Sequence, residues 1–497
     1  MGLRDELLSV YSAGPEAVVA WVEQRAATQA AQMASLLETQ AALSQQVQVL
    51  TTRLVELEAR LKKDSHNSHK PPSSDGPAKL PRRRSRRQRS GKASGGQPGH
   101  SGTTLWQVAE PDRVVVHRAS ACAQCGTVLD HAPITARNRR QVFELPEMPP
   151  QVTEHQVWHQ ACPQCQTLNA GVFPADVTQP TQYGPRVRAL AVYLQEYQHL
   201  PFERTQDYFR DVHHLPISEG TLAQIRINGA ERLEPVTGAI QAALAQAPVV
   251  HVDETGLRIA GQSRWVHVTS TDTLTHYSPQ LKRGQSATDA IGILPVFQGT
   301  VVHDAWPGYF RYPCAHSLCN AHLLRDLKAV SELNHQHWPD KLARLLLTIK
   351  DAVERAVQAG RTALSPRQVR PFAARYRQIV QSALRANPPP KPTGRVGRPG
   401  QGPIRSLVLR LKDQAAAVLA FMHDVRVPFD NNLAERDLRM IKIRQKISGG
   451  FRSWAGAEAF CRIRGYLSTM RKQGHNALDV LTSAFAGSLI LPRLTPE

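Results

Sequence analysis

The sequence contains no run of about 18 apolar residues, the minimum for a helix that spans a membrane. The residues after Met1 also lack the basic and apolar segments of a secretory signal peptide. Both absences predict a cytoplasmic protein without a membrane partner. In that compartment we expect the seven cysteines to stay reduced and to act as metal ligands or core residues.

Acidic side chains are in short supply. Against 41 Asp and Glu the chain has 61 Lys and Arg, so its formal net charge is +20. The commonest partner for such an excess is a polyanion, and a generically soluble basic protein is the alternative. The 497 residues, 41% of them hydrophobic, can form real cores, and length alone suggests roughly three or four units.

A heptad repeat begins at Met33, within an N-terminal region of residues 1–63. One heptad position is always leucine, and the position three residues earlier is apolar except for Gln40. The apolar residues are Leu36, Leu43, Leu50, Leu57, Met33, Val47, Leu54 and Leu61. The pattern predicts a coiled coil through which the chain forms a homo-oligomer, with Gln40 fixing register or strand number. An amphipathic helix packed on its own protein is the alternative.

Residues 64–105 are interrupted by Pro, Ser and Gly and cannot build a core. They contain a cationic run formed by Arg82, Arg83, Arg84, Arg86 and Arg87. Such runs are usually solvated and often contact nucleic acid through phosphates, independently of sequence. We predict DNA contact here, and a merely flexible linker is the alternative.

Two Cys-x-x-Cys knuckles lie in residues 106–178: Cys122 with Cys125, and Cys162 with Cys165. Four thiolates can hold one tetrahedral zinc ion, which would be structural because every ligand comes from protein. The long gap between the pairs predicts a ribbon, with strands at Val114–His117, Gln141–Leu145 and Val152–His159. Four buried core cysteines, the alternative, would not explain the repeated spacing.

Residues 179–247 are predicted to be helical. Phe202–Val212 and Ser218–Asn228 flank a short turn, and Ser218 suits the N-cap of the second helix. This spacing is typical of a helix-turn-helix whose second helix enters a DNA groove. Helix pairs with short turns are common, so an ordinary helical hairpin is the alternative.

From residue 248 the pattern changes to strands. Apolar runs at Val249–Val252, Arg264–Thr269 and Leu274–Tyr277 are followed by a helix at Ser286–Phe297 and a strand at Gly299–His303. This order is that of a ribonuclease-H-like mixed sheet, in which the first and fourth strands are neighbours. We therefore expect Asp253 and Asp304, which follow those two strands, to face one another.

Two carboxylates in one cleft repel unless a cation lies between them. Two magnesium or manganese ions would stabilise the attacking and leaving oxygens of a phosphoryl displacement. The third candidate ligand is Glu435, which precedes a cationic stripe of Arg439, Lys442 and Lys446 suited to a DNA backbone. The alternatives are a capping box from Asn432 to Glu435, ordinary turn acids, and the nearby competitors Glu254, Asp430 and Asp437.

The sheet region, residues 248–330 and 416–497, is divided by residues 331–415. We predict a helical insertion there, with a basic loop at Pro388–Gly400 that embraces DNA; a passive surface insertion is the alternative. Cys319 and His322 could be half of a metal site, with Cys314 nearby, but a packing role is favoured because a fourth ligand is lacking.

Six stretches, in order along the chain, resemble the IS66 family of insertion-sequence transposases. They are Lys63–Asp75, the four knuckle cysteines, Val252–Thr255, Asp304 with Gly308 and Tyr309, Cys319–Arg325 and Asn431–Arg439. The resemblance implies that Asp253, Asp304 and Glu435 are a catalytic triad. One departure is the sequence Asp304-Ala-Trp-Pro-Gly-Tyr309, where the family usually has Asp-Gly-Tyr, so we expect a reshaped turn.

The predicted protein is thus an α/β multidomain transposase of the Asp-Asp-Glu type. Its partners would be the element's terminal inverted repeats and target DNA, with helper proteins as further candidates and a nucleoid-associated location in the cytoplasm. The alternative is a catalytically inactive DNA-binding protein or regulator derived from a transposase. A pure binder does not need three carboxylates at these positions.

Overall fold

A computed structural model describes residues 2–61, 105–390 and 402–495. By their contacts these residues form two compact units, each built from separate stretches of chain. The first unit comprises Met1–Ala78, Pro248–Val252 and Gln298–Asn432, and the second Lys79–Ala247, Asp253–Phe297 and Leu433–Glu497, as far as each is described. Among the described helices, none combines the length and the apolar character that crossing a membrane requires.

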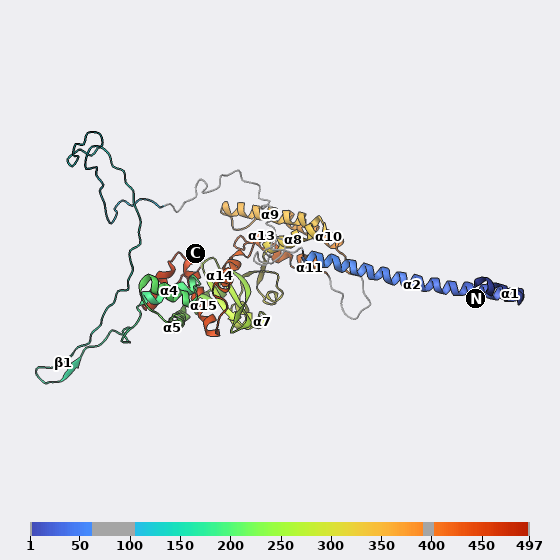
Figure 1. Ribbon diagram of the computed structural model, residues 1–497, viewed down its shortest axis with the longest axis horizontal. Coiled ribbons are helices and arrows are strands. Elements are labelled where there is room, and N and C mark those ends of the chain that lie inside the picture. The colour runs from blue at the N-terminus through green and yellow to red at the C-terminus, as the bar shows by residue number, and fades with distance from the viewer. Residues whose placement is uncertain (1, 62–104, 391–401, 496–497) are drawn as a thin grey trace. The chain divides into compact units, whose positions relative to one another are not determined.

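The chain begins with two helices, α1 (Leu3–Ser12) and the long α2 (Pro15–Leu61) (Figure 1). α1 packs on the beginning of α2, where Arg25 and Glu6 form an ion pair of 3.6 Å. The remainder of α2 runs through the predicted heptads without a break. The helix is therefore confirmed, whereas its pairing into a coiled coil stays a prediction.

The main sheet has five strands in the order β5-β4-β3-β6-β7. They are β3 (Val249–Ile259), β4 (Gln262–Ser270), β5 (Thr275–Gln280), β6 (Thr300–His303) and β7 (Ala315–Leu318). β6 pairs in parallel with both β3 and β7, and β4 pairs with β5 antiparallel. The predicted order of strands and the neighbouring first and fourth strands are confirmed, and β7 was not predicted.

Two boundaries in this region were predicted wrongly. The first strand does not end before Asp253 but continues to Ile259, because Thr255, Leu257 and Ile259 alternate inward and extend the buried face. The helix expected over residues 286–297 divides into α7 (Gln285–Ile291) and the 3-10 helix η3 (Leu294–Val296). Gly292, with a φ of +75°, ends the first of these.

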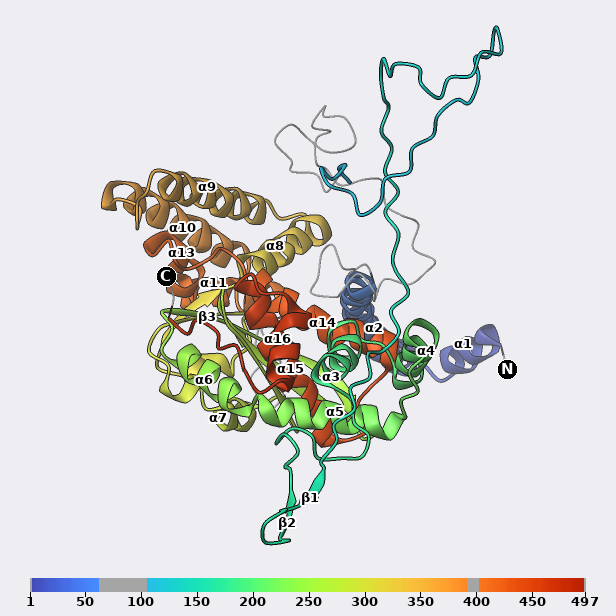
Figure 2. The same cartoon turned by 90° about the vertical axis from the view of Figure 1, so that its left-hand side faces the viewer.

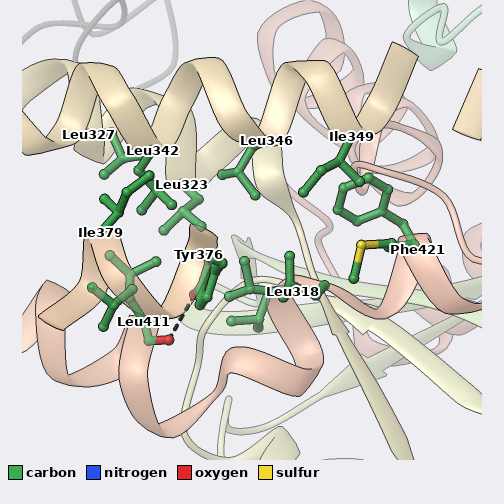
Figure 3. Packing of buried hydrophobic residues seen from close by; sticks show 14 of the residues in the cluster. Leu318, Leu323, Leu327, Leu342, Leu346, Ile349, Tyr376, Ile379, Leu411 and Phe421 are labelled. Atoms are coloured by element: carbon green, nitrogen blue, oxygen red, sulfur yellow. Dashed lines mark hydrogen bonds between the residues drawn. The ribbon is translucent and has the colours of Figure 1, made fainter. Parts of the chain in front are cut away.

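The other helices of the first unit follow β7. They are the 3-10 helix η4 (Tyr309–Arg311), α8 (Asn320–Asn334), α9 (Trp338–Gln358), α10 (Pro366–Ala386), α11 (Pro403–Asp413), α12 (Ala415–Val418) and α13 (Ala420–His423). α9 and α10 lie side by side (Figures 1 and 2). Leu323 of α8 and Leu342 of α9 meet Ile379 of α10 in one apolar core (Figure 3).

The Tyr376 hydroxyl is buried in that core, where it donates a hydrogen bond of 2.8 Å to the Leu411 carbonyl (Figure 3). Burial without that partner would cost free energy, so the bond fixes α10 against α11. The helices expected between residues 331 and 415 are therefore present and share a core. Residues 391–400 of the predicted basic loop lie outside the described residues.

The helices of the second unit flank its strands. They are α3 (Pro185–Val192), the π-helix η2 (Tyr193–Tyr197), α4 (Phe202–His213), α5 (Glu219–Arg232), α6 (Glu234–Ala245), α14 (Asn432–Ser448), α15 (Trp454–Lys472) and α16 (Ala477–Phe485). α15 packs along α5 (Figure 2), and it also packs on β5. Gly465 permits this approach, because a Cβ there would lie 3.2 Å from the Thr275 carbonyl oxygen.

The segment that holds the cysteine knuckles has less regular structure than predicted. Its strands are β1 (His159–Ala161) and β2 (Leu168–Ala170), which pair antiparallel around the second knuckle. Val114–His117 and Gln141–Leu145 are not strands, and of Val152–His159 only the last residue is. Alternating apolar residues favour a strand only where a neighbouring backbone completes the ladder. Instead, the Gln141 side chain hydrogen-bonds the backbone of Val108.

Candidate functional site

Asp253 and Asp304 are positioned by two paired strands. The parallel register of β3 and β6 sets His251 opposite Val302. Asp253 follows His251 by two residues, and Asp304 follows Val302 by two residues. Asp253 lies within β3, partly buried, and its Oδ1 accepts a hydrogen bond of 2.8 Å from the Glu254 amide. Asp304 directly follows β6 and is also partly buried.

The turn after Asp304 explains how the chain accommodates its unusual sequence. The Trp306 amide donates a hydrogen bond of 3.0 Å to Asp304 Oδ1, which orients the carboxylate. The indole ring lies over Gly308, where a Cβ would come within 2.3 Å of it. Trp306 also packs edge-on against Tyr309, the first residue of η4. The additional residues therefore form a packed turn that starts at the acid.

Asn431 connects the chain before α14 to β3. It is buried, its Oδ1 lies 2.9 Å from His251 Nδ1, and its Nδ2 donates a hydrogen bond of 2.9 Å to the Val252 carbonyl. Its backbone amide also donates to Cys319 Sγ at 3.2 Å. One side chain thus fixes the start of α14 to the two residues that precede Asp253. The sequence alone gave no signal for this contact.

Glu435 lies in the first turn of α14, partly buried. The buried face of that helix, including Leu438 and Ile441, packs on residues of β3, β4 and β5. Farther along, Lys442 Nζ donates a hydrogen bond of 2.8 Å to the Gly256 carbonyl of β3. α14 starts at Asn432 itself, so Glu435 does not follow its capping residue by the three positions that a capping box requires.

Each competing acid has a structural partner. Glu254 Oε1 lies 2.6 Å from Arg283 Nε. Asp430 Oδ1 accepts a hydrogen bond of 3.1 Å from the Asn432 amide. Asp437 is buried beside Lys472, with its Oδ2 3.0 Å from Nζ, and its carbonyl accepts from the Tyr277 hydroxyl. These contacts favour local structural roles for all three acids.

The basic residues of α14 fall on two faces. The predicted stripe of Arg439, Lys442 and Lys446 is exposed, although partial burial against β3 lowers the pKa of Lys442 below its ordinary value. Arg444 points inward, and its guanidinium stacks on the rings of Phe451 and Phe460 at 4.6 and 4.9 Å. The predicted cationic run at Arg82, Arg83, Arg84, Arg86 and Arg87 lies outside the described residues.

A buried ion cluster joins the helical region to α14. Glu196 of η2 is fully buried, 3.4 Å from Arg226 of α5 and 3.7 Å from Arg444. Arg444 also donates a hydrogen bond of 3.2 Å to the Gln195 carbonyl. A buried charge is tolerated when it is paired and hydrogen-bonded, so this cluster ties η2, α5 and α14 together.

The expected helix-turn-helix pair is present as two helices. α4 ends at His213 and is capped by His214, whose φ is +51°, and α5 begins after Ser218. Ser218 Oγ accepts a hydrogen bond of 3.1 Å from the Thr221 amide, which confirms it as the N-cap. Contact of α5 with a DNA groove stays a prediction.

The two cysteine knuckles share one backbone geometry. In each, the first cysteine's carbonyl accepts a bond of 2.9 Å from the amide of Gly126 or Gln166, both at positive φ. In the described part of the chain, no three of the four sulfurs lie within 4.8 Å of one another. Hydrogen bonds with the Thr127 hydroxyl first, and then with the Thr127 backbone and Cys122, lower the pKa of Cys125 to about 7. The equivalent hydrogen bond between Cys165 Sγ and the Thr167 hydroxyl lowers the pKa of Cys165.

Cys319 makes packing contacts at the start of α8, while the choice between a packing role and metal binding stays a prediction. It is buried at the start of α8, where its Sγ accepts the Asn431 amide bond and its own amide donates to the His303 carbonyl at 2.9 Å. Its sulfur and a ring nitrogen of His322 also lie within 4.8 Å of each other.

Comparison with known families shows which class of protein this chain belongs to. A model described as the transposase IS66 family matches residues 180–459, which is more than half of the chain. The chain belongs to the IS66 family of transposases. This membership implies a DNA-binding, DNA-cleaving enzyme of a mobile element, in a class that generally uses divalent metals. A second model, of a family of unknown function, matches residues 20–105, and no curated protein matches the chain.

Proposed function

We propose that this transposase cuts and joins DNA at a site formed by Asp253, Asp304 and Glu435. The observation that carries the proposal is the parallel register of β3 and β6, whose last pair, His251 opposite Val302, lies two residues before each aspartate. Carboxylate oxygens are the donors that magnesium and manganese prefer, so these side chains suit the metal the class uses. Bound ions would stabilise the attacking and leaving oxygens of phosphoryl displacement.

The chain itself supplies the positioning. Asn431 holds the beginning of α14 to His251 and Val252, while Lys442 holds its middle to Gly256. On β3, Asp253 lies between Val252 and Gly256, the two residues contacted. Along the chain of α14, Glu435 lies between Asn431 and Lys442, the two residues that contact them. These contacts favour a ribonuclease-H-like core in which Glu435 of α14 and Asp253 of β3 act together.

The proposed reaction has two displacements. Water attacks a phosphodiester at an end of the element and frees a 3′-hydroxyl, which then attacks a phosphodiester of target DNA with loss of the target's own 3′-oxygen. Arg439, Lys442 and Lys446 would contact the DNA backbone, as would the arginines at positions 82, 83, 84, 86 and 87. The zinc-bound ribbon and the α4–α5 pair would recognise the terminal inverted repeats.

Zinc would be held by Cys122, Cys125, Cys162 and Cys165. The matching turns and the hydrogen bonds that favour thiolate at Cys125 and Cys165 suit that ion. Gathering the two pairs around zinc would fold the intervening segment. The coiled coil of α2 would bring two copies together, so that one assembly pairs two element ends.

The test is magnesium-dependent nicking of a duplex that carries the inverted repeats flanking the gene. Asp253→Asn, Asp304→Asn and Glu435→Gln should each abolish nicking while DNA binding persists. Asp430→Asn is the matched control, because an amide oxygen still accepts the Asn432 bond. Nicking that survives any of the three substitutions would overturn that residue's role. Binding without cleavage by the unaltered protein would favour the rival, a DNA-binding regulator.

A further inference from the structure

The outer face of α10 carries a row of arginines to which the proposed chemistry assigns no role. Four exposed side chains form this row: Arg367, Arg370, Arg377 and Arg385. The last three follow the first by 3, 10 and 18 residues. At about 3.6 residues per turn, all four therefore leave the helix within roughly 80° of one another. The opposite face of α10, which includes Tyr376 and Ile379, is buried in the core of the first unit (Figure 3).

No acid interrupts the row, because none of the 21 residues of α10 is Asp or Glu. In the described part of the chain, none of the four guanidinium groups forms an ion pair or a hydrogen bond with another side chain. α9 has the same length and lies in the same unit, yet it has three acids among its basic residues: Asp340, Asp351 and Glu354. Soluble surfaces normally mix both signs of charge, so the positive field of α10 is available to an anionic partner.

The chemistry of the row fits the phosphates of a DNA backbone. All the basic residues of α10 are arginines, whose planar group binds phosphate oxygens through two parallel hydrogen bonds. The row is about 27 Å long, at about 1.5 Å per residue, and a duplex of that length has about eight base pairs. A protein partner would need an apolar or aromatic anchor. The exposed residues between the arginines are instead small or polar: Ala374, Gln378 and Gln381.

We propose that the outer face of α10 is a DNA-binding surface that contacts the duplex backbone independently of sequence. The inference rests on the DNA partner of the proposed function, and not on its three catalytic acids. Phosphate contacts position a duplex but do not read its bases, so the surface adds affinity for any DNA that reaches it. The helical insertion thereby has a function of its own, which is to hold DNA.

The first test measures duplex binding by the full chain with magnesium withheld, so that cleavage plays no part. Replacing Arg367, Arg370 and Arg377 with glutamine removes three charges, and glutamine has nearly the helix propensity of arginine. We expect binding at about 150 mM salt to weaken at least tenfold. The plot of log association constant against log salt concentration should become shallower by about three. Lysine at the same three positions keeps the charges and should keep the slope.

The matched control removes three positive charges from the exposed surface of α9, through Lys341→Gln, Arg344→Gln and Arg355→Gln. Its slope should differ from that of the unaltered chain by less than about one. An α10 variant that binds like the unaltered chain, or equal weakening by both variants, would overturn the proposal. An unaltered chain that binds no duplex would reject the DNA partner as well. Failure of the catalytic proposal would appear elsewhere, as nicking that survives Asp253→Asn.

The second test locates the contact. A photoreactive benzoylphenylalanine in place of Gln381, between the arginines, should cross-link to a bound duplex on irradiation. The same group in place of Thr348, which is exposed on α9, should not. Cross-linking from position 348 that equals or exceeds that from position 381 would overturn the location. A double-stranded RNA of equal length that competes more strongly than DNA would overturn DNA as the ligand.

Discussion

Replacing Asn431 with alanine would remove one buried side chain that contacts two residues of β3. The change leaves His251 Nδ1 and the Val252 carbonyl without the bonds of 2.9 Å that each now makes. An unsatisfied buried polar group costs about 1–3 kcal/mol, so we expect a loss of about 2–6 kcal/mol in the free energy of unfolding. Urea denaturation measures that loss.

The more specific consequence concerns metal use. Because Asn431 lies beside the residues before Asp253 and four positions before Glu435, its loss should loosen both acids. Single-turnover nicking at saturating enzyme should then need at least tenfold more magnesium for its half-maximal rate. Asn431→Asp provides a second variant, since it keeps the acceptor for His251 but cannot donate to Val252.

The matched control is Asn432→Ala, which changes the exposed neighbouring residue. It should alter stability by less than about 0.5 kcal/mol and leave the magnesium dependence unchanged. If the Asn431 variants unfold more easily but, once folded, require no more magnesium than the wild type, the residue is structural only. If the Asn431 variants match Asn432→Ala both in the free energy of unfolding and in the magnesium requirement, the role inferred for the contact of Asn431 with His251 and Val252 is refuted.

Three further results are expected. Glu196→Gln should cost about 3 kcal/mol in urea unfolding, because its arginines stay buried without a countercharge; an unchanged midpoint would contradict this. Alkylation of Cys125 in zinc-free protein should rise through about pH 7, since its pKa is lowered to about 7, and Thr127→Val should move that midpoint upward. An unchanged midpoint in Thr127→Val would exclude the Thr127 hydroxyl as a cause of the lowered pKa of Cys125. Gly308→Ala should lower nicking at least tenfold with DNA binding intact, because its Cβ would displace Trp306; full activity would show that the turn adapts.

Local patterns in the sequence predicted much of the fold. Apolar runs located β4, β5 and β6, and Ser218 located the start of α5 through a cap that needs only neighbouring residues. The same local information predicted that α4 and α5 would be helices. The three proposed catalytic acids came from their positions after apolar runs and from the family resemblance, and their roles stay predictions.

Long-range contacts could not be predicted in this way. Asn431 meets β3 across 180 residues of sequence, and nothing near it indicates that its amide is buried. Glutamate is usually found at the protein surface, so the sequence suggests an exposed side chain at position 196. Glu196 is instead buried, and its partners come from α5 and α14. The prediction of strands around the knuckles was wrong because it used local information alone. Alternating apolar residues form a strand only beside a partner strand, which the local pattern does not supply.

The apolar face shared by β3, β4 and β5 has a consequence for how the protein is made. Leu257, Val266 and Tyr277 pack against Leu438 and Phe460, which the ribosome adds only near the end of synthesis. Until then these strands have no cover, and uncovered strands are prone to aggregate. We expect a gene copy that stops before α14 to give insoluble protein, so that DNA cutting is confined to full-length translation products.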